Sequence, residues 1–208
     1  FFLARISNAN YIFIDNNSLL SARQFLRINE RQLSFIPNGV PDFGPIVREP
    51  QTKELSLLMA ARVCDAKDHE TLVRAFELAK LPCILYLVGH GTDSIDFQNN
   101  IILWAPTKNG LIRLMGQVSD VENYLAKADV YCLISNFEAL PISIIEAMAS
   151  GLPVLASDVG DCRKLVSNGV NGYVVSTKDP FQLASRIEAL GPVDGRWQMG
   201  QASRQKYL

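Results

Sequence analysis

The most informative part of this chain is the stretch VYCLISNFEALPISIIEAMASG at positions 130–151. It opens with a continuous apolar run at 130–134, which is typical of a strand that is covered on both faces of a sheet. A polar loop follows, and Pro141 then suits the start of a helix that Gly151 ends. We therefore expect a strand, a loop and a helix in direct succession.

On both sides of this stretch, apolar runs alternate with segments of helical period, as in a parallel sheet wrapped by helices. The segments 72–79 and 184–190 carry apolar residues at helical spacing. Residues 92–110 are polar and less periodic, so we expect a loop or a short irregular helix there. The fold class is α/β, a doubly wound, Rossmann-like parallel sheet. Six strands are expected, at 55–60, 83–88, 111–115, 130–134, 154–156 and 173–175.

Two of the expected helices carry capping signals in the sequence. Ser119 and Glu122 have the spacing of a capping box. Asp179 resembles an N-cap, with Pro180 at the first helical position. We expect a helix to begin at each place.

The first 38 residues form a piece of their own. We expect a strand at 11–14, a helix from Asn17 or Ser18 and a strand at 33–36, before Pro37-Asn38-Gly39 breaks the pattern. Two strands and one helix cannot close a hydrophobic core, so this piece either packs on the main domain or belongs to a further domain. We assign 1–38 to the remnant and crossover of an amino-terminal domain, and 39–208 to the main domain.

Composition and charge limit the kinds of partner. Twenty basic residues against 21 acidic ones give a formal net charge of -1, so the chain has no overall positive field for nucleic acid or an acidic membrane surface. The most apolar long stretch, 139–156, holds Glu146 and two prolines, which makes it a poor membrane span. The four cysteines lack metal-site spacing, which favours reduced core thiols and a cytoplasmic setting.

The candidate site follows from where the central helix begins. Ligands of an open parallel sheet bind at the carboxyl ends of its strands, where a helix start offers unpaired amides and about half a positive charge to a phosphate. Leu140, Pro141 and Ile142 would lie there. Glu146 is roughly 7 to 8 Å further along the helix, about the distance of a ribose whose hydroxyls a carboxylate can bind. Glu138, on the other side of the diphosphate, would hold sugar hydroxyls. The alternative is two solvated carboxylates.

A pair of cations follows the strand expected at 55–60, at the same edge of the sheet. Arg62 offers a fork of donors for phosphate oxygens and Lys67 a mobile point charge, so together they can neutralise a leaving diphosphate without a metal. The alternative is solvated loop charges.

Two other loops end at this edge. Gly89 and Gly91 would let a backbone approach a ligand closely. His90 between them fits a loop residue better than a catalytic base, because no carboxylate partner is identifiable near it in the sequence. The loop at 160–163 either lines the pocket or is a plain turn.

At these positions the chain resembles the retaining glycosyltransferases of family four, which have the GT-B fold of two facing Rossmann-like domains. The resemblance covers residues 9–205, and its most specific element is the pair Glu138 and Glu146. It implies that Glu146 binds the ribose, Glu138 the donor sugar, and Arg62 with Lys67 the diphosphate. The backbone that would meet the base belongs to Gly116, Gln117 and Val118.

The resemblance implies transfer of a sugar from a nucleoside diphosphate sugar, a UDP- or GDP-sugar, with retention of configuration and without a divalent metal or other cofactor. The chain departs from the family in two ways. Ala139 stands where a glycine is usual, a mild change, and nearly all of the amino-terminal domain that supplies the acceptor site is missing. We therefore expect this chain to bind the donor but to transfer poorly to a sugar or lipid-linked acceptor.

The resemblance also suggests a setting, which is polysaccharide or glycolipid biosynthesis in the cytoplasm, with peripheral association of the full-length protein with the inner face of the membrane. Two other classes remain. A regulatory module that binds nucleotide sugars without transferring them would have the same ligand site, and only donor consumption by the full-length protein separates the two. A sugar-nucleotide epimerase of this fold would not be expected to carry the two glutamates.

Overall fold

The computed structural model describes residues 10–14, 16–26, 30–36, 38–42 and 54–208, and the main body lies within 54–208. Its six strands form one parallel sheet in the order β5-β4-β3-β6-β7-β8. This confirms the doubly wound α/β fold. The strands are β3 (Leu55–Ala60), β4 (Cys83–Val88), β5 (Ile112–Leu114), β6 (Val130–Leu133), β7 (Val154–Ser157) and β8 (Gly172–Val175).

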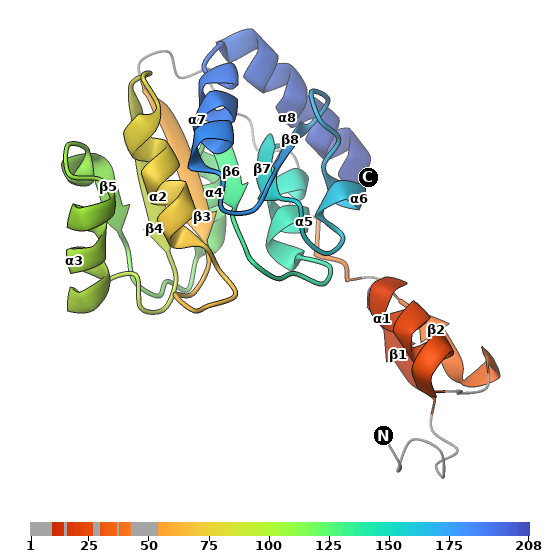
Figure 1. The fold of residues 1–208 in the computed structure, drawn as a ribbon. Helices are drawn as coiled ribbons and strands as arrows, with labels where there is room; N and C mark the ends of the chain where they lie inside the picture. The colour runs from red at the N-terminus through yellow and green to blue at the C-terminus, as the bar shows by residue number, and fades with distance from the viewer. Residues whose placement is uncertain (1–9, 15, 27–29, 37, 43–53) are drawn as a thin grey trace.

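Helices cover both faces of this sheet (Figure 1). Strand residues alternate between the two cores, because Leu57 and Met59 of β3 join one cluster while Leu58 joins the other. One cluster holds α2 (His69–Leu78), α3 (Ile95–Trp104) and α7 (Pro180–Ala189). The other holds α4 (Val121–Lys127), α5 (Ile142–Ala149), α6 (Cys162–Leu165) and α8 (Val193–Tyr207).

The order of strands reverses between β3 and β6, which lie side by side. The chain moves from β3 to β4 and β5 on one side, and then crosses to β6, β7 and β8 on the other. Such a switch point opens a crevice at the carboxyl ends of the two central strands. The loops that leave β3 and β6 therefore face each other across the expected ligand site.

The prediction for residues 92–110 was wrong, because this segment contains a regular helix, α3. Ser94 caps it by accepting a hydrogen bond from the amide of Phe97 at 3.3 Å. Phe97 and Ile101 are its only buried residues, one turn apart. Ile95, Ile102 and Leu103 of the same helix are exposed, so its apolar residues are not confined to one face, and the weak period did not reveal the helix. A short 3-10 turn, η4 (Asn109–Leu111), follows and leads into β5.

The two capping predictions had different outcomes. Asp179 caps α7, since its carboxylate accepts from the amide of Gln182 at 2.9 Å and Pro180 opens the helix. The Ser119 and Glu122 capping box was wrong. The N-cap of α4 is Asp120, and no side-chain cap hydrogen bond forms there. A helix does begin at this point, one residue later than a Ser119 cap would place it.

The amino-terminal piece has the predicted elements. Its strands are shorter than expected and pair in parallel as a two-stranded sheet. The structure does not describe residues 1–9, 15, 27–29, 37 and 43–53. Because Pro37 is among them, the domain division at 38/39 stays a prediction. The elements are β1 (Tyr11–Phe13), α1 (Asn16–Ser21), the π-helical turn η2 (Ala22–Leu26), the 3-10 turn η3 (Glu30–Gln32) and β2 (Leu33–Phe35).

The segment 38–42 joins this piece to the main body. The Asn38 side chain donates to the Leu140 carbonyl at 3.1 Å, and the Tyr207 hydroxyl donates to the Val40 carbonyl at 3.0 Å. Asp42 forms an ion pair with Arg204 of α8. Across the part of the chain that the structure describes, no helix combines the length and hydropathy of a membrane span.

Candidate functional site

The loops that follow β3 and β6 are joined by backbone hydrogen bonds. The amide of Asp68 donates to the carbonyl of Ile134 at 2.9 Å, and the amide of Asn136 donates to the carbonyl of Ala66 at 2.9 Å. The side-chain amide of Asn136 adds a bond to the Asp65 carbonyl at 2.8 Å. The two loops therefore form one unit at the switch point.

Lys67 and Glu138 meet inside this unit, although 71 residues separate them in the sequence. The Lys67 ammonium pairs with Oε1 of Glu138, and the Ser135 hydroxyl donates to the same oxygen at 2.7 Å. The side chains of Lys67 and Glu138 are only 19% and 10% exposed. The residue expected at the diphosphate and the residue expected at the sugar are thus in direct contact, so the two predicted subsites adjoin.

The loop after β7 supports the backbone of Glu138. Gly160 has φ +53, and a Cβ there would lie 2.1 Å from the Glu138 carbonyl oxygen. The amide of Asp161 donates to the Ala139 carbonyl at 2.9 Å. Arg163 pairs with Asp158 at the surface. Of the two roles left open for this loop, the observed contacts are those of packing against 138–139.

Helix α5 begins where Pro141 predicted it. Pro141 is its N-cap, and no side chain caps the helix. The first-turn amides of any helix lack intrahelical acceptors, and none of the described backbone carbonyls accepts from residues 142–144. Leu140 and Pro141 are buried while Ile142 is exposed. This helix end is therefore suited to an anion.

Glu146 lies on α5, half-buried, and no hydrogen bond or ion pair to its carboxylate is found among the described residues. Burial raises the pKa of this carboxyl, and the nearby Glu122 raises it further. A partly desolvated carboxylate without a partner is typical of a binding site, because a ligand can supply the hydrogen bonds that the protein does not.

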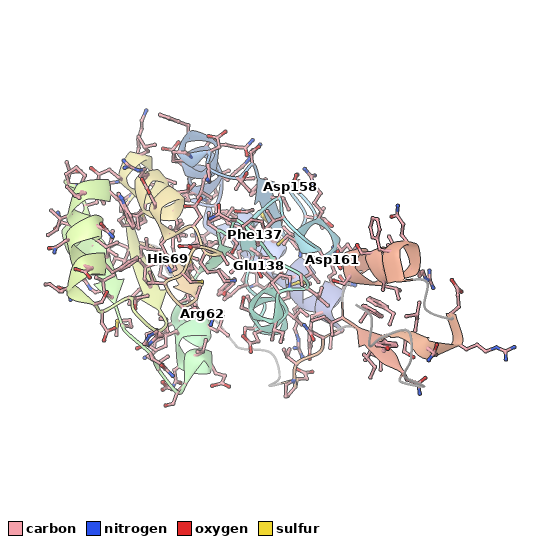
Figure 2. The ribbon with its side chains drawn as sticks, turned by 60° about the horizontal axis from the view of Figure 1, so that its bottom comes forward. Arg62, His69, Phe137, Glu138, Asp158 and Asp161 are labelled. Atoms are coloured by element: carbon pink, nitrogen blue, oxygen red, sulfur yellow. The ribbon has the colours of Figure 1, made fainter. Side chains whose placement is uncertain are left out.

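Arg62 extends from the loop after β3 and is exposed (Figure 2). Within the part of the chain that is described, no ion pair or hydrogen bond engages its side chain. The guanidinium is therefore free to move toward an anion at the crevice, unlike the ammonium of Lys67.

The predicted glycines serve contacts between the loops themselves. Gly89 has φ +139, and a Cβ there would lie 2.3 Å from the Ala61 carbonyl oxygen. The Gly89 amide donates to the Gly116 carbonyl at 2.7 Å, which joins the loops after β4 and β5. The nearest backbone approach at Gly89 is therefore made by Ala61. Gly91 also has a positive φ, Gln117 is exposed and Val118 is half-buried.

Sequence reasoning missed three residues at this site. Ser135 and Ser157 are buried, and the Ser157 hydroxyl accepts from the Ser135 amide at 3.0 Å. His69, to which no role was assigned, is 3% exposed at the start of α2, while His90 is an exposed loop residue as expected. Burial lowers the pKa of His69 to about 4. The one local signal for Ser135 in the sequence is its position three residues before Glu138.

No group of His, Cys, Asp or Glu side chains that could hold a metal ion occurs among the described residues. The four cysteines are free thiols, three of them buried in the core. The candidate site combines backbone amides, two cations, two carboxylates and hydroxyls.

Comparison with known proteins identifies the family of this chain. A family described as "Glycosyl transferases group 1" matches residues 54–191. The N,N'-diacetylbacillosaminyl-diphospho-undecaprenol alpha-1,3-N-acetylgalactosaminyltransferase of Campylobacter jejuni is 26% identical over 228 residues, covering 91% of this chain and 58% of that protein. The UDP-Gal:alpha-D-GlcNAc-diphosphoundecaprenol alpha-1,3-galactosyltransferase of Escherichia coli is 28% identical over 170 residues, covering 74% and 44%.

Among solved structures, Anabaena Alr3699/HepE in complex with UDP superposes with a TM-score of 0.84 at 19% identity, covering 99% of this chain and 60% of that one. This likeness supports the fold. The chain spans about half the length of the curated relatives it matches. Because the family match takes in the whole sheet and both glutamates, this chain belongs to the group 1 glycosyl transferases.

Proposed function

We propose that this chain is the donor-binding half of a retaining glycosyltransferase that uses a nucleoside diphosphate sugar. The observation that carries the proposal is Glu146, a half-buried carboxylate without a partner on the helix whose uncapped start opens at the switch point. It lies five residues, or roughly 7.5 Å, beyond Pro141 along the helix axis. That spacing suits a ligand with an anion at one end and two vicinal hydroxyls further on.

Each part of the donor then has a place. The first-turn amides of α5 receive the diphosphate together with Arg62, while Glu146 accepts hydrogen bonds from the ribose hydroxyls. The backbone at 116–118 meets the base. Glu138 accepts from a hydroxyl of the transferred sugar, and Lys67 lies between that sugar and the diphosphate.

The reaction breaks the bond between the anomeric carbon and the diphosphate oxygen, and the electron pair leaves with the diphosphate. The acceptor hydroxyl bonds to the same face of the anomeric carbon and gives its proton to the departing diphosphate oxygen. The negative charge that grows on the leaving group is stabilised by the α5 amides and by the two cations, so we propose that no divalent metal is required.

The names of the relatives support a donor and an acceptor class. The Escherichia coli relative is named for UDP-galactose, both named enzymes act on sugars linked to diphospho-undecaprenol, and Alr3699/HepE was solved with UDP. We propose a UDP-sugar, with a GDP-sugar as the second choice, and a lipid-linked acceptor bound by the remainder of the protein. Envelope polysaccharide or glycolipid assembly at the cytoplasmic face of the membrane is the corresponding setting.

Calorimetric titration tests the proposal. UDP, GDP and ADP, each with and without an attached sugar, are titrated into the wild type and into Glu146→Ala and Arg62→Ala. We expect one nucleotide series to bind, and each variant to weaken it about tenfold or more, because a hydrogen bond to a charged group is worth about 1.5 to 3 kcal/mol. Glu70→Ala and Arg74→Ala, an exposed pair on α2, are the matched controls.

The site assignment fails if no nucleotide binds, or if neither variant weakens the binding that is seen. The full-length protein with an acceptor then separates an enzyme from a binding module. Consumption of the donor supports the transferase, whereas tight binding without consumption supports a regulatory role.

A further inference from the structure

The Glu138 carboxylate is held through one of its two oxygens. The Ser135 hydroxyl and the Lys67 ammonium both contact Oε1, and no described residue donates a hydrogen bond to Oε2. Glu138 is only 10% exposed, so few waters can take the place of such donors. One oxygen is anchored by the protein, and the other is available to a ligand.

The two donors differ in what they impose on the carboxylate. Lys67 supplies charge from the end of a flexible four-carbon stem, which does not fix a direction. Ser135 is 1% exposed, its hydroxyl is one carbon from the backbone, and its amide is tied to the Ser157 hydroxyl at 3.0 Å. The direction of the carboxylate is therefore set by Ser135.

We propose that Ser135 is a positioning residue for the donor sugar. Resting on the proposed function, the inference is that Ser135 turns Oε2 of Glu138 into the crevice, where it accepts a hydrogen bond from a hydroxyl of the transferred sugar. Ser135 also keeps this orientation when the diphosphate attracts Lys67, because its bond to Oε1 does not depend on that cation. In the proposed function, the nucleotide is held by Glu146, Arg62 and the start of α5. The Ser135 amide, in contrast, donates to the Ser157 hydroxyl, and the Ser135 hydroxyl donates to Glu138.

The test compares a nucleoside diphosphate with its sugar conjugates on the same chain. UDP and GDP are titrated alone and as UDP-galactose, UDP-N-acetylgalactosamine, UDP-glucose and GDP-mannose, and the pair that binds the wild type best is then used for the variants. For Ser135→Ala we expect sugar-nucleotide affinity to fall about three- to tenfold, while affinity for the diphosphate changes less than about twofold. Ser135→Thr, which keeps the hydroxyl, should restore most of the sugar-nucleotide affinity.

A double-variant cycle with Glu138→Ala shows whether Ser135 acts through that carboxylate. Once Glu138 is removed, Ser135→Ala should have no further effect on sugar-nucleotide binding. The matched control is Ser203→Ala, a buried serine whose hydroxyl bonds to the Asn171 carbonyl on the opposite side of the domain body, and it should change neither affinity. If Ser135→Ala does not fold, Ser135→Cys replaces it, since a thiol has nearly the same shape and is a weak donor.

The inference is overturned if Ser135→Ala weakens the diphosphate and its sugar conjugate equally, if it changes neither, or if its effect adds to that of Glu138→Ala. Each of these results leaves nucleotide binding, and hence the proposed function, in place. A wild type that binds no nucleotide removes the proposed function and this inference with it.

Discussion

His69 makes the stability of this domain depend on pH in a way that can be calculated. Its ring is 3% exposed at the start of α2, and burial lowers its pKa from 6.5 to about 4. The unfolded chain takes up a proton near pH 6.5, whereas the folded chain does so only near pH 4. Between these values the unfolded state binds more protons, so acid favours unfolding.

The magnitude follows from the gap between the two values. One pKa unit is worth about 1.4 kcal/mol, so the full effect is about 3 kcal/mol, present above pH 6.5 and lost as the pH falls to 4. Between about pH 7 and about pH 5 the loss is about 2 kcal/mol. This is a large fraction of the stability of a typical domain.

Urea unfolding at about pH 7, 6 and 5 measures this loss for the wild type and for His69→Phe. The phenyl ring removes the titration and gives up no bond at Nε2, which is buried without a hydrogen-bond partner among the described residues. It can also keep the edge-on contact that the His69 ring makes with Phe97. We expect the free energy of unfolding of the variant to fall about 2 kcal/mol less than that of the wild type. His90→Gln, at the exposed histidine, should behave as the wild type. Equal slopes for His69→Phe and the wild type would refute the reasoning.

Three further predictions concern the site. Gly160→Ala should cost about 3 kcal/mol or more in urea unfolding, because its Cβ would lie 2.1 Å from the Glu138 carbonyl oxygen. Gly169 also has a positive φ, but a Cβ there would meet open space, so Gly169→Ala should cost only about 1 kcal/mol. Equal losses of stability in the two variants would contradict the clash at Gly160. Affinity for the nucleotide should fall as the pH is lowered toward the raised pKa of Glu146, because protonation removes an acceptor, and titration of Glu146→Gln should show a flatter profile. A steep profile in that variant would assign the effect to another group. Lys67→Met should lower the free energy of unfolding by about 2 kcal/mol, because the Glu138 carboxylate loses its cation and keeps only the Ser135 hydroxyl. Adding Glu138→Gln should recover part of this loss. A double variant less stable than Lys67→Met would argue against the pairing.

The sheet was predictable because its strands are marked locally. Runs such as 83–88 and 130–134 lack polar alternation, and the observed strands begin and end within two residues of the expected ones. Pro141 marked the start of α5 just as directly. In contrast, α3 buries only Phe97 and Ile101 and leaves other apolar residues exposed, so its pattern does not show the one-sided period of an amphipathic helix.

Local sequence therefore established the fold class, the helix start at Pro141 and the two glutamates on either side of it. The tertiary structure alone decided that β3 and β6 are neighbours, and this adjacency joins Lys67 to Glu138 across 71 residues. It also decided that Gly89 and Gly160 meet other loops closely, and that His69 and Ser135 are buried. The physical reason is range. Backbone propensity and hydrophobic period act over a few residues, whereas ion pairs, burial and close backbone contacts depend on which strands pair. The order of strands in a sheet cannot be inferred from any single segment of the sequence.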